Sequence, residues 1–173
     1  MADAQSIFKS KFKDYSTFLR DVSFDKDKNE YLCQDAIQEV YDFDKITKDM
    51  YPSKQPSSYD ALLLQKDKIY CIEFKNERYA DINRKIIVKK LQNGREVLNQ
   101  ILSENNIPKS DYSFIFCVAY KDTETRWRRG IEKNEVQFEL EEYKGKYFDE
   151  IYTNDIQFFT HEYKKHFKKE LAC

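Results

Sequence analysis

Two neighbouring stretches of this chain have the pattern of buried β-strands: Ser58-Tyr59-Asp60-Ala61-Leu62-Leu63-Leu64 and Ile69-Tyr70-Cys71-Ile72-Glu73-Phe74-Lys75. Apolar side chains alternate onto both faces of each stretch, which is typical of central strands covered on both sides. Asp60, Glu73 and Lys75 alone interrupt this hydrophobic character. Because burial of an unpaired charge is costly, we expect these three side chains to share a purpose.

The turn between the two strands determines whether the three side chains meet. Glu73 and Lys75 share a face, because residues two apart in a strand point the same way. A two-residue turn at positions 66–67 places Asp60 opposite Glu73, and a four-residue turn places it opposite Lys75. A three-residue turn would place Asp60 opposite Phe74 and separate the charges, unless a bulge intervenes.

Two carboxylates and a lysine on one face suit metal-dependent hydrolysis. Carboxylate oxygens are hard ligands that Mg²⁺ or Mn²⁺ prefers, and a lysine beside them can position or deprotonate an attacking water. A metal ion that polarises a phosphoryl oxygen then promotes cleavage of a phosphodiester. The order Asp60, a spacer, then Glu73-x-Lys75 at the end of the second strand resembles the restriction-endonuclease-like superfamily, the PD-(D/E)XK nucleases.

This resemblance implies roles for the residues of the motif. Asp60 and Glu73 would be catalytic and hold Mg²⁺ (or Mn²⁺) together with the main-chain carbonyl of Phe74, and Lys75 would position the water. Members of the superfamily also have a helix before the sheet that often carries another acid.

Residues 31–50 have apolar residues at helical spacing and are interpreted as that leading helix. Glu39 is, by position, the candidate additional catalytic and metal-binding acid. Asp35, Asp42 and Asp44 are alternatives on the same predicted helix. An ordinary solvated role for Glu39 fits the pattern equally well.

The rest of the chain predicts an α/β fold. Further helices are expected over residues 6–22, 80–105 and 155–171, and further strands over residues 112–120, 136–141 and 147–152. Gly94 lies in the long middle helix, where glycine permits a kink or a break. The order α-α-β-β-α-β-β-β-α indicates an α/β core, which the resemblance makes a restriction-endonuclease-like core, a mixed central β-sheet flanked by helices.

Length and composition predict a single domain over residues 1–173, with residues 1–25 as an N-terminal helical extension. No apolar run approaches the roughly 20 residues that cross a bilayer, and the N-terminus lacks an apolar signal region. We therefore expect a cytoplasmic protein with no membrane partner. The cysteines are scattered and predict neither a zinc knuckle nor a disulfide framework; they are Cys33, Cys71, Cys117 and Cys173.

Basic residues cluster after the motif although the net charge is only −1. Phosphate contacts are expected from them, and Trp127 between arginines is suited to stacking on an exposed base. The candidate nucleic-acid-binding residues are Arg78, Arg84, Lys85, Lys89, Arg126, Trp127, Arg128 and Arg129. For the helical members, an ordinary solvated face explains the pattern at least as well.

The sequence thus predicts a Mg²⁺-dependent endonuclease in which an activated water attacks a phosphodiester of nucleic acid, DNA rather than RNA. A homodimer is compatible with cutting both strands. The alternative is a catalytically silent nuclease fold that acts as a binding or immunity-type protein through protein partners. A third interpretation makes Glu73 and Lys75 an ion pair at a strand end.

Overall fold

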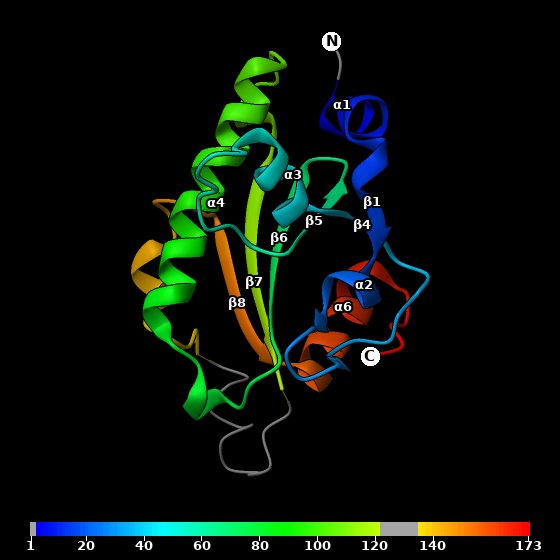
Figure 1. Ribbon diagram of the computed structural model, residues 1–173, viewed down its shortest axis with the longest axis vertical. Helices are drawn as coiled ribbons and strands as arrows, with labels where there is room; N and C mark the ends of the chain where they lie inside the picture. Colours follow the sequence, from blue (N-terminus) through cyan, green and yellow to red (C-terminus); the bar gives the residue numbers. More distant parts are fainter. Residues whose placement is uncertain (1–2, 122–134) are drawn as a thin grey trace.

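The computed structural model describes residues 3–121 and 135–173 (Figure 1). Its centre is a mixed six-stranded sheet with the strand order β1-β4-β5-β6-β7-β8. The strands are β1 Ser16–Phe18, β4 Glu39–Asp42, β5 Ala61–Gln65, β6 Lys68–Lys75, β7 Ser113–Tyr120 and β8 Glu150–Asp155. From β1 to β6 neighbours pair antiparallel, whereas β6, β7 and β8 pair parallel. The predicted α/β architecture with a mixed, helix-flanked sheet is confirmed.

Helices cover both faces of this sheet. On one face, α1 (Ala4–Lys11), α3 (Phe43–Met50) and α4 (Arg84–Glu104) pack on the larger hydrophobic cluster. On the other face, α2 (Leu19–Val22) and α6 (Ile156–Phe167) pack on the smaller cluster. A separate two-stranded hairpin joins β2 (Phe24–Asp25) to β3 (Glu30–Tyr31). Short 3₁₀ turns are η1 Lys13–Tyr15, η2 Tyr79–Asp81, η3 Lys109–Asp111 and η4 Leu140–Tyr143.

The hairpin of β5 and β6 has the two-residue turn, at positions 66–67. Ala61 pairs with Ile72, and the Asp60 N–H donates to the Ile72 carbonyl at 3.0 Å. Asp60 therefore lies opposite Glu73. This register is one of the two that were predicted to gather the charges on one face.

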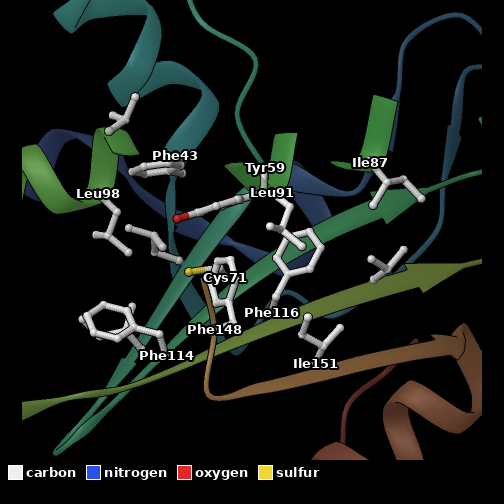
Figure 2. Close-up of a cluster of buried hydrophobic side chains, with 14 of the residues drawn as sticks. Phe43, Tyr59, Cys71, Ile87, Leu91, Leu98, Phe114, Phe116, Phe148 and Ile151 are labelled. Carbon is white, nitrogen blue, oxygen red and sulfur yellow. The ribbon is translucent and has the colours of Figure 1, made fainter. Parts of the chain in front are cut away.

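The long middle helix is confirmed as α4, which continues through Gly94 without a break. A Cβ atom added at Gly94 would lie 2.5 Å from Cε1 of Tyr59, whose hydroxyl donates to the Gly94 carbonyl at 3.2 Å. Tyr59 is fully buried, and its ring centroid lies 4.7 Å from that of Phe43. Figure 2 shows the two rings stacked. Glycine is required here because the helix backbone touches an aromatic ring.

Two predicted elements near the ends of the chain are wrong, and a third has shifted bounds. Residues 6–22 form α1, β1 and α2 rather than one helix, and β1 pairs with β4, so this segment belongs to the central sheet and is not a helical extension. Residues 136–141 form no strand, because Phe138 and Glu139 have φ of 61° and 55°, which a strand does not allow. The last strand, predicted over residues 147–152, begins at Glu150 as β8, while the predicted closing helix is present as α6.

Residues 31–50 are not one helix either. They contain the end of β3, the strand β4 and the helix α3. Asp42 separates the last two, since its side chain accepts from the Lys45 N–H at 2.9 Å and caps α3. Val40 is buried and Glu39 is exposed, which is the alternation of a strand.

A disulfide bond joins Cys33 to Cys173 across 140 residues of sequence, contrary to the prediction of no disulfide. Asp35, which is buried, reinforces this junction by accepting from the Ala172 N–H at 3.1 Å. Cysteines so far apart have no spacing motif, which explains the wrong prediction. Disulfides persist mainly in oxidising compartments, which does not match the predicted cytoplasmic location.

Within residues 3–121 and 135–173, the helices are too short or too polar to serve as membrane spans.

We expect Gly94→Ala to lower the free energy of unfolding by about 1–3 kcal/mol, the usual cost of overpacking a core. Alanine favours a helix over glycine by about 1 kcal/mol. A loss of stability on this substitution would therefore come from the contact with Tyr59 and not from helix propensity. Urea denaturation measures it. In a Tyr59→Leu background the same substitution should cost much less, and an equal cost in both backgrounds would contradict this account.

We expect Cys173→Ser to lower the free energy of unfolding by about 2–5 kcal/mol, because the bond closes a long loop in the unfolded chain. Denaturation with and without dithiothreitol measures the effect. The reductant should lower the stability of the unmodified protein and leave that of the variant unchanged. Equal stabilities of the two proteins without reductant would argue against the bond.

Candidate functional site

Four charged side chains meet between the hairpin and α4, and we call them the charge cluster: Asp60, Glu73, Lys75 and Lys90. Asp60 directly precedes β5, and Glu73 and Lys75 lie near the carboxyl end of β6. Lys90 reaches them from the second turn of α4, which covers this face of the sheet. Figure 1 shows that β6 ends at the same end of the molecule at which α4 begins.

The contacts within the charge cluster are close. Lys90 Nζ donates to both carboxylate oxygens of Glu73, at 2.8 and 3.0 Å, and lies 3.6 Å from Asp60 Oδ1. Lys75 Nζ lies 3.1 Å from Glu73 Oε1. The Phe74 N–H donates to Asp60 Oδ2 at 2.7 Å and orients that carboxylate. The structure thus brings together Asp60, Glu73 and Lys75, as the sequence predicts.

Burial is uneven across the charge cluster. The Glu73 side chain is completely buried, whereas the side chains of Asp60 and Lys90 are each 22% exposed and that of Lys75 is 16% exposed. One edge of the cluster therefore reaches solvent. A site for a charged ligand needs such access, and a purely structural ion pair does not.

The pKa values of the charge cluster reflect burial and mutual repulsion. Burial, followed by the charge of Glu73, raises the pKa of Asp60 to about 8, against the opposing influence of Lys90, the Phe74 N–H and Lys75. Burial lowers the pKa of Lys90, but the charges of Asp60 and Glu73 outweigh it and hold that pKa above its usual value. Lys90 is therefore a permanent cation beside the two acids.

Glu39 does not join the charge cluster. It begins β4, is exposed, and pairs with Phe18 of β1. The other end of β4 is the near one, because the Phe43 N–H donates to the Asp60 carbonyl at 3.0 Å. At about 3.3 Å per residue, Glu39 lies roughly 13 Å along the strand from that point. The structure thus gives no support to Glu39 as a catalytic or metal-binding acid.

Among the alternative acids, Asp44 acts electrostatically on the charge cluster. It stands in the first turn of α3, where it accepts from Gln55 Nε2 at 2.9 Å and from Ser58 Oγ at 3.3 Å. Its charge contributes to the raised pKa of Lys90. Asp42 is occupied as a helix cap, and Asp35 as a buried partner of the C-terminal segment.

Arg84 is held by acids rather than free for phosphate. Its guanidinium donates to Glu142 at 2.8 Å and to the Phe138 carbonyl at 2.9 Å, and it lies 3.1 Å from Glu139. These contacts join the start of α4 to the segment around η4. A structural role therefore explains Arg84.

The other predicted phosphate contacts differ in position. Lys85 and Lys89 are exposed and, at 100° per residue, stand on the side of α4 opposite the buried residues Ile87 and Leu91. They therefore face solvent and not the charge cluster. Arg78 is exposed just before η2. The predicted contacts Arg126, Trp127, Arg128 and Arg129 lie outside the described residues.

The donor set of the charge cluster fits a hard divalent ion. Mg²⁺ typically takes one or two carboxylates and keeps several waters, and Asp60 and Glu73 supply two carboxylates that share one cation. Their repulsion, visible in the raised pKa of Asp60, is what a metal relieves. No larger group of His, Cys, Asp and Glu suited to a metal occurs among the residues that the structure describes. Phe74 contacts the cluster through its N–H, so the role of its carbonyl remains a prediction.

Lys90 is the member that sequence analysis missed. The helical periodicity contains a signal, because position 90 lies about 70° from the centre of the buried stripe formed by Ile87, Leu91, Gly94 and Leu98. A lysine at the border of a buried stripe needs an anionic partner, whereas Lys85 and Lys89 do not.

Comparison with known proteins adds no assignment. A scan against protein-family models and searches of curated proteins and of solved structures find no match. The candidate site therefore rests on its own geometry.

The raised pKa of Asp60 predicts how stability depends on pH in the metal-free protein. Because the folded-state pKa is above the ordinary value of 3.8, the contribution of this group to stability is full below about pH 4 and is lost as the pH rises towards 8. We expect Asp60→Asn, which keeps an oxygen for the Phe74 N–H, to lack this loss. Urea denaturation in EDTA at about pH 5 and pH 8 measures it. A difference between the two proteins that is the same at both pH values would contradict the assignment.

Proposed function

We propose that this chain is a metal-dependent phosphodiesterase acting on nucleic acid, an endonuclease with a site of the PD-(D/E)XK kind. The observation that carries the proposal is the convergence of Asp60, Glu73 and Lys75 at the solvent-reaching end of β6. Burial of two acids side by side lowers stability. Proteins retain such a destabilising pair of acids mainly at sites where their function requires it.

The surrounding fold supports the proposal. The motif hairpin of β5 and β6 is followed by the long helix α4, by β7 parallel to β6, and finally by α6. This is the succession that the resemblance implies for a restriction-endonuclease-like core. The charge cluster also lies at the carboxyl end of the parallel strands, where ligands of α/β proteins usually bind.

The residues of the charge cluster divide the chemistry among them. Mg²⁺ or Mn²⁺, held by Asp60 and Glu73 with the Phe74 carbonyl, would supply Lewis acidity and a more acidic water when bound. Lys75 holds the attacking water or a phosphate oxygen, since its ammonium stays beside Glu73. The Phe74 N–H keeps Asp60 in place. Because the cluster is largely buried, these electrostatic contacts are stronger than they would be in water.

The proposed substrate is DNA rather than RNA, cut by a monomer or a homodimer. Exposed Lys85 and Lys89 on α4 supply positive charge for phosphate contacts away from the charge cluster. Arg84 does not take part, since Glu139 and Glu142 hold it.

One observation favours a second candidate function. Lys75 and Lys90 lie beside the two acids, so the chain itself supplies as many lysines as there are acids in the charge cluster. A nuclease fold that has become a silent binding or immunity-type protein would have this property. The two candidate functions make different predictions: the nuclease binds a divalent metal ion and cleaves nucleic acid, and the silent binding protein does not cleave nucleic acid.

Nuclease assays test the proposal. With Mg²⁺ or Mn²⁺ the protein should cleave plasmid DNA, and Lys75→Ala should reduce the rate at least about 100-fold, the usual contribution of a positioned acid–base group. Lys48→Ala removes an exposed lysine of α3 outside the site and should leave the rate unchanged. Circular dichroism checks that each variant is folded.

Two results would overturn the nuclease assignment. Cleavage by folded Lys75→Ala at the original rate would show that the activity comes from elsewhere. Failure of the unmodified protein to cleave plasmid DNA or RNA with either metal would leave the silent binding protein as the better description.

A further inference from the structure

Lys90 occupies the space between the two acids of the charge cluster. Its Nζ contacts both oxygens of Glu73, at 2.8 and 3.0 Å, and lies 3.6 Å from Asp60 Oδ1. Mg²⁺ binds carboxylate oxygens at about 2.0–2.1 Å. An ion shared by Asp60 and Glu73 would therefore need the volume that this ammonium group fills.

The charge balance also opposes simultaneous occupancy. Asp60 and Glu73 are matched by Lys75 and Lys90, so a divalent ion would leave two unbalanced positive charges in a largely buried region. Like charges a few ångströms apart in such surroundings repel by several times the amount that they would in water. One of the two lysines has to leave when a metal binds.

Lys90 is the lysine that can leave. Lys75 lies on β6, two residues from Glu73 and on the same face of the strand, and the proposed mechanism needs it there to hold the water. Lys90 comes from α4 on a flexible four-carbon stem, its side chain is 22% exposed, and the charge of Asp44 on α3 also acts on it. The Lys90 side chain can therefore move towards solvent, where Asp44 is another acid that can attract it.

We propose that Lys90 is a resident cation that closes the metal site of this protein and is displaced when a divalent ion binds to Asp60 and Glu73. This inference rests on the proposed function, because it takes those two acids as metal ligands. In the metal-free state Lys90 pairs with Glu73 beside Asp60 and stabilises the fold. The affinity for metal is then reduced by the free energy needed to move Lys90 out.

Metal binding and stability of the whole chain test this role. Lys90→Met removes the charge while keeping the length of the side chain, and Lys90→Gln is a second neutral variant that can still donate to Glu73. Lys90→Arg keeps the cation. Lys48→Met on α3 is the matched control, because it removes an exposed lysine outside the charge cluster. Calorimetric titration with Mn²⁺ at neutral pH gives the affinity, and thermal unfolding in EDTA and in Mn²⁺ gives the stability.

We expect the neutral variants to bind Mn²⁺ at least about tenfold more tightly than the unmodified protein, since a competing charge is gone. Their melting temperature should be lower in EDTA, because two acids are left with one cation, and should rise more on addition of Mn²⁺. Lys90→Arg should bind Mn²⁺ no more tightly than the unmodified protein. Lys48→Met should match the unmodified protein in both measurements.

The opposite results separate this inference from the proposed function. If the unmodified protein binds Mn²⁺ and the neutral variants bind it equally or more weakly, Lys90 is not a competitor, while the metal site stands. If none of the proteins binds Mn²⁺ and no melting temperature responds to it, both the metal site and the role of Lys90 are overturned. A lower melting temperature in EDTA without tighter binding would mark Lys90 as a structural partner only.

Discussion

The two-residue turn between β5 and β6 sets the register on which the rest of the structure depends. Side chains of a strand alternate between its faces, so a slip of one residue would turn the apolar residues of β5 onto the wrong layers. In the observed register Cys71 packs with α4 on one face, and Ile72 packs with α6 on the other. The same register places Asp60 opposite Glu73. The register of the hairpin therefore determines both which apolar side chains face each helical layer and where the charged side chains lie.

The packing of α4 on the sheet then decides the electrostatics of the charge cluster. Gly94 lets the helix backbone approach Tyr59 closely, and Lys90 lies one turn earlier on the same helix, directed at the carboxylates. Without its two lysines, the completely buried Glu73 would be strongly destabilising. The hairpin thus buries an acid that needs nearby cations, and α4, which follows in the chain, supplies one of them as Lys90.

The successes and failures of the sequence analysis follow the range of the forces involved. The strands β5, β6 and β7 and the helix α4 were predicted well, because long apolar patterns leave a strong local signal. The helix over residues 31–50 was wrong, since the side chain of Asp42 caps α3 and ends β4 at the same residue. Around Phe138 an alternating pattern came from a turn whose apolar side chains reach the core without strand geometry.

The sequence by itself determined the hairpin, its permitted registers and the three charges that interrupt it, because alternation and turn length are local properties. Tertiary structure alone decided that Lys90 joins those charges, that Glu39 stays remote, and that Cys33 meets Cys173. Lys90 and Glu73 are separated by 17 residues, and the two cysteines by 140. The helical period indicates only that Lys90 lies at the border of a buried stripe. Which acids it meets, and which cysteines meet, depends on which distant surfaces bury each other, and the sequence pattern does not contain that information.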